Sequence, residues 1–155
     1  MNIAILNLKE LDELNYTVDC LEFIDTEIID AHIDIFTGYD FSDTIKNPHI
    51  RNLFKLDIRD IKVADLSARY SQIRSYSRFY KYDITIDTEC SFKTAIIAYL
   101  LSGKTAGFKK RGFVGYFIAK FYDEVVSYDT SKDKRELTFE LLKKVFGFEN
   151  TYLVK

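Results

Sequence analysis

The order of hydrophobic and polar residues along the chain predicts strands that alternate with helices. Residues 2–8, with the sequence NIAILNL, form an almost continuous apolar run, which is typical of a buried parallel strand. Apolar side chains then recur at helical spacing from Leu11 to Leu21, which predicts an amphipathic helix to about Phe23. The chain therefore opens with a strand followed by a helix.

The remainder of the chain repeats this alternation. Further strands are predicted at 32–38, 52–58, 83–88 and 124–129, with a short strand or turn at 104–108. Helices are predicted at 63–80, from Ser91 to a stop at Gly103, within 109–122, and before a stop at Gly147. Such alternation along a whole chain predicts an α/β domain with a mostly parallel sheet.

Length and composition fit one such domain. With 155 residues, the chain is long enough for a sizeable core but short for two domains. The formal net charge of -2 argues against nucleic-acid binding through overall charge. No apolar run approaches the ~20 residues that a bilayer-crossing helix needs, and no signal-peptide pattern opens the sequence. We therefore expect a cytoplasmic protein without a transmembrane segment.

The cysteine and histidine patterns predict no metal site. Cys20 and Cys90 lie far apart, without a CxxC spacing, so two buried, reduced thiols are expected. His32 and His49 form neither an HxxxH nor an HExxH pattern. Neither metal nor cofactor is expected from these residues.

A general rule for open α/β sheets locates the ligand site. Ligands bind beyond the carboxyl ends of the strands, at the point where the strand order reverses. In a 3-2-1-4 strand order this rule selects the loops at 8–13 and 88–93, which would flank one crevice. Neither loop contains GxGxxG or a Walker A pattern, so a standard dinucleotide or P-loop site is not predicted.

Three residues in these loops are candidates for chemistry. Asp12 and Glu13 lie near the start of a helix, where a carboxylate is favoured as a simple cap; facing the crevice, either could instead act as a general base. Lys93 lies in the first turn of a helix, where a cation is unfavourable by about 0.3–1 kcal/mol. It is either a solvated side chain or a group that holds an anion at the crevice.

Basic residues also gather elsewhere along the chain. Taken singly, each is a solvated surface charge; together with Lys93 they would form a basic rim for a phosphorylated or carboxylated substrate. These residues are Arg59, Lys62, Lys109, Lys110 and Arg111.

Two segments resemble the N-terminal domain of bacterial glycosyltransferase family 9, the ADP-heptose:lipopolysaccharide heptosyltransferases. In that family the first strand leads to a Gly-Asp pair and a helix that carries a Thr. In residues 1–17, MNIAILNLKELDELNYT, Asp12-Glu13 stand at the place of Gly-Asp, and Thr17 is retained. Residues 82–94, YDITIDTECSFKT, match the family pattern YDxxIDxQGxxKS. The matching positions are Tyr82, Asp83, Ile86, Asp87, Lys93 and, conservatively, Thr94.

The resemblance implies that residues 1–155 form the Rossmann-like, three-layer, acceptor-binding half of a GT-B enzyme. A second domain would bind most of the ADP-sugar donor, and an anionic lipopolysaccharide core acceptor would bind here. The transfer would invert the anomeric centre without a metal from this half, and contact with the inner membrane surface would be peripheral. In these roles Glu13, or Asp12, would be the base. Lys93, Arg59, Lys62 and Thr17 would lie near the acceptor.

Some positions depart from the family pattern. Asp12 replaces a Gly, Glu89-Cys90 replace Gln-Gly, and Asp133 stands where a His is frequent. Because the nucleotide-sugar domain is not within these residues, no sugar transfer is expected from the chain alone. The alternative is an inactive binding or interaction module. A receiver-like or flavodoxin-like domain ranks lower, because Lys93 is predicted within a helix.

Overall fold

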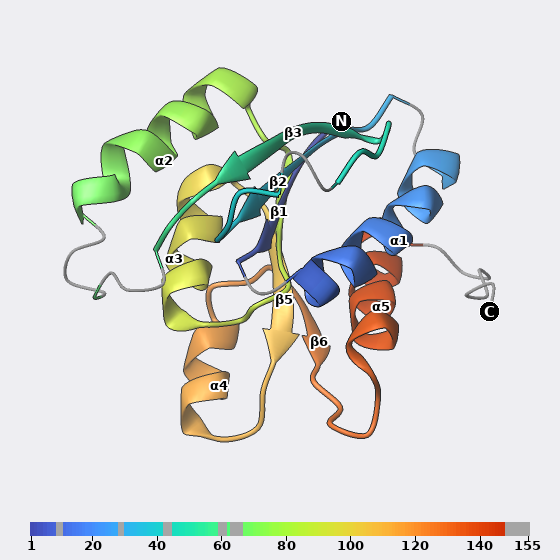
Figure 1. Cartoon of the computed structure of the whole chain (residues 1–155). Helices are drawn as coiled ribbons and strands as arrows, with labels where there is room; N and C mark the ends of the chain where they lie inside the picture. Colours follow the sequence, from blue (N-terminus) through green and yellow to red (C-terminus); the bar gives the residue numbers. More distant parts are fainter. Residues whose placement is uncertain (9–10, 28–29, 42–44, 59–61, 63–66, 148–155) are drawn as a thin grey trace.

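The computed structural model is a doubly wound α/β domain around one parallel sheet (Figure 1). It describes residues 1–8, 11–27, 30–41, 45–58, 62 and 67–147. Within these residues the strand order is β3-β2-β1-β4-β5-β6, and every neighbouring pair is parallel. The strands are β1 (Asn2–Asn7), β2 (His32–Thr37), β3 (Ile50–Lys55), β4 (Ile84–Asp87), β5 (Thr105–Lys109) and β6 (Glu124–Ser127). The helices are α1 (Leu11–Glu27), α2 (Ser67–Tyr80), α3 (Phe92–Leu101), α4 (Phe113–Ala119) and α5 (Lys134–Phe146).

The helices cover both faces of the sheet. In Figure 1, α1 and α5 pack on one face, while α2, α3 and α4 lie on the other. Side chains alternate across β1, so Ile3 and Ile5 enter the core that includes residues of α1 and α5. Ala4 and Leu6 enter the core beneath α2 and α3. Burial on both faces explains why the strand is apolar from Ile3 to Leu6.

The α/β class and the predicted strand order are confirmed, and the element boundaries shift. The strand predicted at 52–58 lies at Ile50–Lys55, and the first helix continues to Glu27 rather than Phe23. The final helix ends as predicted, because Gly147 adopts the left-handed conformation with φ of 72°.

The helix α3 ends at Leu101 with Ser102 as its cap, so Gly103 is the first residue beyond the cap, as predicted. The end has no left-handed glycine, however, because Ser102 is extended and Gly103 does not have a positive φ. Ser102 forms a parallel bridge with Tyr82, and its hydroxyl donates to the carbonyl oxygen of Lys104. This pairing pulls the chain directly from the helix toward β5, so no glycine turn is needed.

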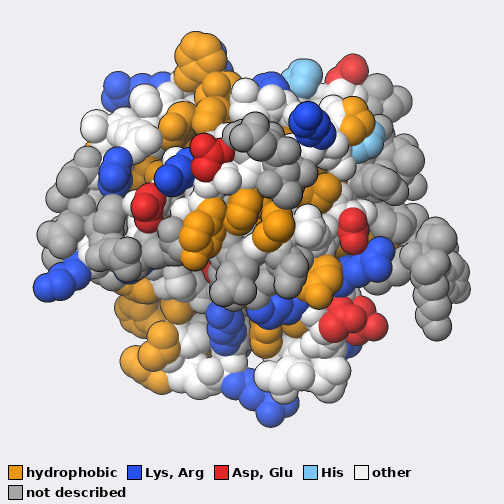
Figure 2. Space-filling model, viewed as in Figure 1, with side chains coloured by type: hydrophobic (Ala, Val, Ile, Leu, Met, Phe, Trp, Pro, Cys, Tyr) orange, Lys and Arg blue, Asp and Glu red, His pale blue; other side chains and the backbone are white. Residues whose placement is uncertain are grey.

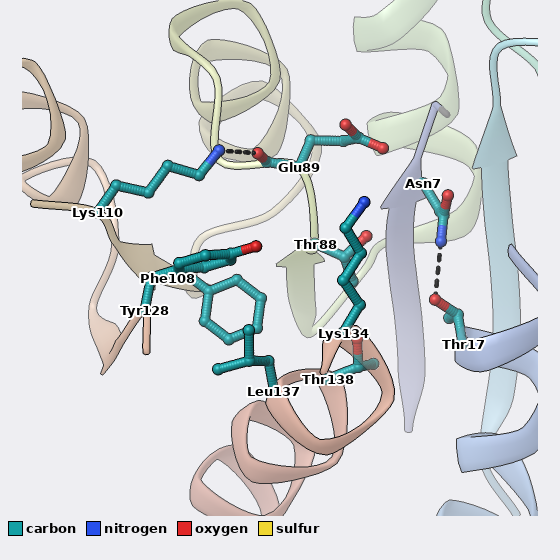
Figure 3. Close-up of a pocket in the computed structure, with 10 residues that line it drawn as sticks. All are labelled: Asn7, Thr17, Thr88, Glu89, Phe108, Lys110, Tyr128, Lys134, Leu137 and Thr138. Carbon is teal, nitrogen blue, oxygen red and sulfur yellow. Dashed lines mark hydrogen bonds between the residues drawn. The ribbon is translucent and has the colours of Figure 1, made fainter. Parts of the chain in front are cut away.

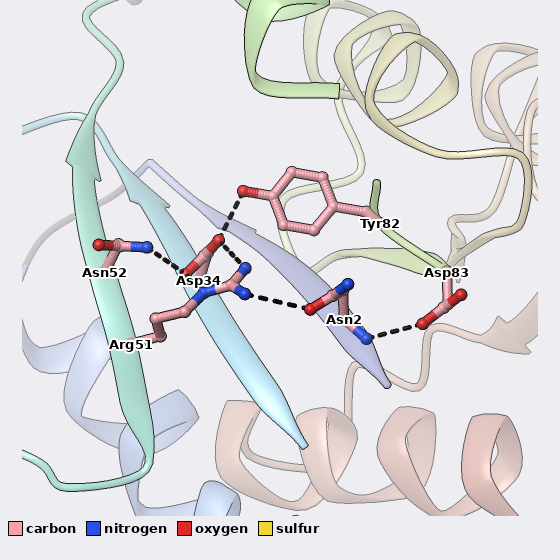
Figure 4. Close-up of polar contacts among 6 residues, drawn as sticks. All are labelled: Asn2, Asp34, Arg51, Asn52, Tyr82 and Asp83. Atoms are coloured by element: carbon pink, nitrogen blue, oxygen red, sulfur yellow. Dashed lines mark hydrogen bonds and ion pairs between the residues drawn. The ribbon is translucent and has the colours of Figure 1, made fainter. Parts of the chain in front are cut away.

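A buried carboxylate fastens the strands on one side of the sheet (Figure 4). Asp34, in β2, has no exposed surface. Its oxygens accept hydrogen bonds from the Arg51 guanidinium at 2.9 and 2.5 Å and from Asn52 Nδ2 at 2.9 Å. The Tyr82 hydroxyl donates a further bond of 2.7 Å. One carboxylate therefore connects β2, β3 and the entrance to β4.

The first two residues of the 82–94 motif, Tyr82 and Asp83, take part in the hydrogen bonds on this side of the sheet. Tyr82 binds Asp34, and Asp83 Oδ2 accepts a 2.7 Å hydrogen bond from the amide nitrogen of Asn2. Burial, together with the bonded carboxylate, raises the pKa of Tyr82, so the phenol stays a donor. Both residues precede β4, at the end opposite to the loops at which a ligand was predicted.

Replacing Tyr82 by Phe tests how much this hydrogen-bond network contributes to the stability of the fold. The substitution keeps the ring but removes one donor from a buried carboxylate, so the free energy of unfolding should fall by about 1–3 kcal/mol. Denaturant-induced unfolding measures the change. Tyr99→Phe is the matched control, because Tyr99 is 66% exposed, and it should leave stability within about 0.5 kcal/mol. Equal effects of the two substitutions would contradict the role given to Asp34.

Candidate ligand site at the carboxyl ends of the strands

The loops that follow β1 and β4 meet at one point of the carboxyl edge. The amide nitrogen of Leu8, directly after β1, donates a 2.9 Å hydrogen bond to Oε1 of Glu89. The amide nitrogen and hydroxyl of Thr88 donate to the carbonyl oxygen of Leu6 at 3.2 and 2.9 Å. Chain connections leave β1 and β4 in opposite directions here, which is the point where such sheets bind ligands. The two corners predicted from the sequence are therefore neighbours.

Asp87, the last residue of β4, holds the second corner in shape. Its Oδ1 accepts from the amide nitrogens of Glu89 and Cys90 at 2.9 and 3.0 Å. Its Oδ2 accepts a 2.6 Å hydrogen bond from the Tyr122 hydroxyl. Burial raises the pKa of Asp87, and the hydrogen bonds from Tyr122 and the backbone oppose this shift without cancelling it. The matched Asp of the motif thus shapes the loop rather than facing solvent.

Cys90 occupies the position where the family pattern has Gly, and its backbone explains that preference. Cys90 has φ of 52°, a left-handed conformation that costs a non-glycine residue roughly 1–2 kcal/mol. Its buried Sγ accepts a 2.8 Å hydrogen bond from the amide nitrogen of Phe108 in β5. β4 ends at Asp87, and the sulfur of Cys90 takes the place of a strand carbonyl as acceptor for the Phe108 amide. Both cysteines are buried and free, as predicted.

Glu89 does not project into solvent as an added negative charge. It is 7% exposed, and its carboxylate caps the amide nitrogen of Leu8. The backbone carbonyl oxygen of Glu89 accepts a 2.9 Å hydrogen bond from Lys110 Nζ. That ammonium also lies 5.7 Å from the ring centre of Tyr128, within the range of a cation–π contact.

A small hollow opens beside these corners (Figure 3). It offers about 30 Å³ to water-sized occupants, which is close to the volume of one water molecule. Lys110 lies on one side, and the side chain of Lys134 extends into it from the start of α5 (Figure 3). Its lining is Asn7, Thr17, Thr88, Glu89, Phe108, Lys110, Tyr128, Lys134, Leu137 and Thr138.

The lining suits one anionic or hydroxyl-rich group of a larger ligand. Two ammonium groups supply positive charge, while Thr88, Thr138 and Tyr128 supply hydroxyls that donate and accept. Since the space admits little more than a water, a sugar would lie across the mouth and send one substituent inward. A wider open hollow adjoins it, with about 390 Å³ between the basic loop and β6. Its lining is Lys109, Lys110, Arg111, Ser127, Tyr128 and Asp129.

Thr17, predicted near the acceptor, lines the hollow from α1. It is 1% exposed, and its hydroxyl oxygen accepts a 2.8 Å hydrogen bond from Asn7 Nδ2. Asn7 is the last residue of β1, so this bond anchors α1 to the end of the strand. The contact shows Thr17 positioning the first corner, and direct contact with an acceptor stays a prediction.

Lys93 lies on another side of the same corner. It is the second residue of α3, behind the Ser91 cap, and its Nζ donates a 3.2 Å hydrogen bond to the carbonyl oxygen of Ile58. The half-buried ammonium therefore connects the β4 corner to the segment that follows β3. Lys93 is not among the residues that line the hollow.

The remaining predicted site residues are Asp12, Glu13, Arg59 and Lys62. Asp12 and Glu13 lie in the first turn of α1, but their side chains fall outside the described part of the structure. Arg59 lies outside the described residues, and Lys62 is exposed. That Glu13 and Lys93 face one crevice therefore stays a prediction. Among the described residues, no group of three or more acidic, histidine or cysteine side chains could hold a metal ion.

Two residues of the site were missed at the level of sequence. Tyr122 carries no local signal, because it is one of 11 tyrosines and lies 35 positions from its partner Asp87. Lys134 did carry a signal. It directly follows the helix cap Asp133, and a cation in a first helical turn was the reason for selecting Lys93. Asp133 itself caps α5 by accepting from the amide nitrogen of Glu136 at 2.8 Å.

Comparisons with known proteins agree with the resemblance seen in the motifs. No protein-family model matches the sequence. Lipopolysaccharide heptosyltransferase 1 of Campylobacter coli is 28% identical over 134 residues, which are 86% of this chain and 38% of that protein. The structure of E. coli heptosyltransferase WaaC with ADP matches with a TM-score of 0.78 at 17% identity, over 96% of this chain and 48% of that chain. A glycosyl transferase family 9 structure from Veillonella parvula gives 0.75 at 18%, over 93% and 40% respectively.

The chain thus spans about half, or less, of the length of the relatives it matches. The predicted resemblance is confirmed: this chain is similar to heptosyltransferases of glycosyltransferase family 9. Its fold is that of a Rossmann-like half of a GT-B enzyme. Of the helices in the described part, none is long and apolar enough to cross a membrane.

The raised pKa of Asp87 predicts a pH dependence of stability. Between the pKa of an unfolded Asp, about 4, and the raised folded value, the folded protein holds a proton that the unfolded chain has lost. The contribution of Asp87 to the free energy of unfolding therefore falls as the pH rises through this window. Asp87→Asn should remove that fall, so the variant gains stability relative to wild type as the pH rises. Denaturant unfolding from about pH 4 to about pH 8 measures the difference.

Asp129→Asn serves as a control of opposite sign. Hydrogen bonds from Ser131 lower the pKa of this exposed carboxyl, so its contribution is present above the unfolded pKa and lost as the pH falls. The Asn variant should accordingly lose stability relative to wild type as the pH rises. A difference between wild type and Asp87→Asn that stays constant across the range would contradict the assignment.

Proposed function

We propose that the chain is the acceptor-binding half of an inverting heptosyltransferase that acts on the anionic core of lipopolysaccharide. The observation that carries the proposal is the 28% identity to lipopolysaccharide heptosyltransferase 1 over 86% of this chain. It is supported by the meeting of the β1 and β4 corners, where α/β sheets bind ligands. The donor would be an ADP-linked heptose, bound mainly by a second domain of the kind that the longer relatives have room for.

The chemistry would be a direct displacement. An acceptor hydroxyl attacks the anomeric carbon of the donor, a new C–O bond forms, and the bond from that carbon to the ADP oxygen breaks. ADP leaves with the bonding electron pair. The hydroxyl proton passes to Glu13 or Asp12, which start the helix after β1. Attack on the face opposite to ADP inverts the anomeric centre.

The cations at this edge would orient the acceptor. Lys134 and Lys110 line the small hollow, and Lys109 and Arg111 line the wider one beside it. Of these groups, Lys134 and Lys110 would pair with the phosphates and acidic sugars of a lipopolysaccharide core. Lys93, Arg59 and Lys62 would extend the same positive rim toward the segment after β3. Contact with the inner membrane would be peripheral, since the acceptor is itself carried on a lipid.

Binding can be tested on the chain alone. Titration with a soluble, heptose-free inner-core oligosaccharide should show saturable binding. Lys134→Gln should weaken it by about tenfold, the loss expected for one charge-assisted hydrogen bond. Lys46→Gln, a change of equal charge at an exposed lysine outside both hollows, should leave affinity unchanged. Equal weakening by both substitutions would contradict a specific site.

Transfer requires a second half. The chain should be combined with the donor domain of a relative, and ADP release should be followed with the same acceptor. Glu13→Gln, or Asp12→Asn, should lower the rate by about 10²–10⁴ if that carboxylate is the base. Unchanged rates in both variants would exclude both carboxylates. Acceptor binding with no ADP release would indicate the alternative, a binding module without catalysis.

A further inference from the structure

The short helix α4 presents an aromatic surface that the proposed site does not use. Phe113 is 81% exposed, and Val114, Tyr116 and Phe117 are each about half exposed or more. The same helix buries only Gly115 and Ile118. Figure 2 shows hydrophobic side chains gathered at the lower left, over α4. Because exposing large rings to water is unfavourable, a contiguous group of them marks an interaction surface.

Cations are interleaved with these rings. Lys109 and Lys120 place their ammonium groups 5.3 and 5.1 Å from the ring centre of Tyr116. Arg111, also exposed, lies between Lys109 and the start of the helix. Gly115 lets α4 lie against the basic loop, since a Cβ at that position would come within 2.1 Å of the Lys110 carbonyl oxygen. The positive charge and the rings therefore form one surface.

We propose that α4 and the cations Lys109, Arg111 and Lys120 dock the protein on an anionic lipid membrane, with the ring of Phe113 entering the interface. Aromatic rings beside lysine and arginine are the usual composition of helices that lie in a membrane surface. The cations meet the negative headgroups, while Tyr116 provides a ring with a polar end suited to the headgroup region.

A protein partner fits this surface less well. The centres of protein–protein interfaces are depleted of lysine, whereas here two lysines lie against the ring of Tyr116, between Phe113 and Phe117 in the sequence. These cations form a locally positive surface on a chain whose net charge is -2. The chemistry thus matches a layer of anionic headgroups above hydrocarbon. This inference deepens the proposed function, since a lipid-borne acceptor must be met at a membrane.

A single fluorescent reporter can test the insertion. The natural sequence holds no Trp, so Phe113→Trp introduces one reporter without removing an apolar ring. With vesicles of phosphatidylglycerol and phosphatidylcholine in equal parts, its emission should shift to the blue and be quenched by brominated lipid. Phe79→Trp is the matched control, because Phe79 is 79% exposed but lies at the end of α2. An unchanged Phe113→Trp spectrum, or equal shifts in both variants, would overturn the proposal.

The charges need a separate measurement. Lys109→Gln with Lys120→Gln should weaken vesicle binding about 25-fold, given about fivefold for each cation at an anionic surface. Lys46→Gln with Lys81→Gln removes the same charge from exposed positions elsewhere and should weaken binding much less. Equal losses would show unspecific attraction and overturn the assignment.

Gel filtration without lipid distinguishes a protein partner. A self-associated chain that becomes monomeric on Phe113→Ser would assign α4 to a contact between copies and also overturn the membrane proposal. A wild-type chain that stays monomeric is the supporting result. None of these measurements uses donor or acceptor sugar, so their failure is separate from a failure of the proposed transfer reaction.

Discussion

The buried carboxylate of Asp87 is the interaction on which the carboxyl edge of the sheet depends. It collects two backbone amides and the Tyr122 hydroxyl within 3.0 Å, and none of these donors is a cation. Dipoles alone must therefore compensate for its loss of hydration, which is why its pKa is raised rather than lowered. The gain is geometric: the chain turns sharply after β4 and places Glu89 against Leu8. Without that turn, the two corners of the candidate site would not meet.

The side chain of Tyr122 links Asp87 to the next βαβ unit. The residue follows α4, and its ring crosses β5 so closely that a Cβ on Gly107 would lie 2.6 Å from it. A glycine in the middle of a strand usually weakens it, but here it admits the ring that reaches Asp87. The position of α4 and the shape of the β4 corner are thus linked through one side chain. A substitution at Gly107 would disturb both.

The order of elements followed from the sequence because the central strands β1, β2 and β4 are buried along almost their whole length and carry apolar side chains at half or more of their positions. The predicted boundaries of the strands were wrong where polar contacts determine them. β3 begins at Ile50 rather than 52 because Arg51 and Asn52 pair with the buried Asp34, which no hydrophobic pattern reveals. The same limit applies to the site. The rule for strand ends located both corners, but the pairing of Tyr122 with Asp87 needed the folded chain.

The basic loop after β5 connects the two proposals of site and surface. Lys109 ends β5 and turns to Tyr116 of α4, whereas Lys110 turns to Glu89 at the hollow. Neighbouring residues of an extended chain point to opposite sides, so one short segment serves both directions. If α4 rests on a membrane, a sugar carried by a lipid of that membrane would emerge beside Lys110 and the hollow. The protein would then hold the reacting hydroxyl at the site, which would not depend on free diffusion of the acceptor.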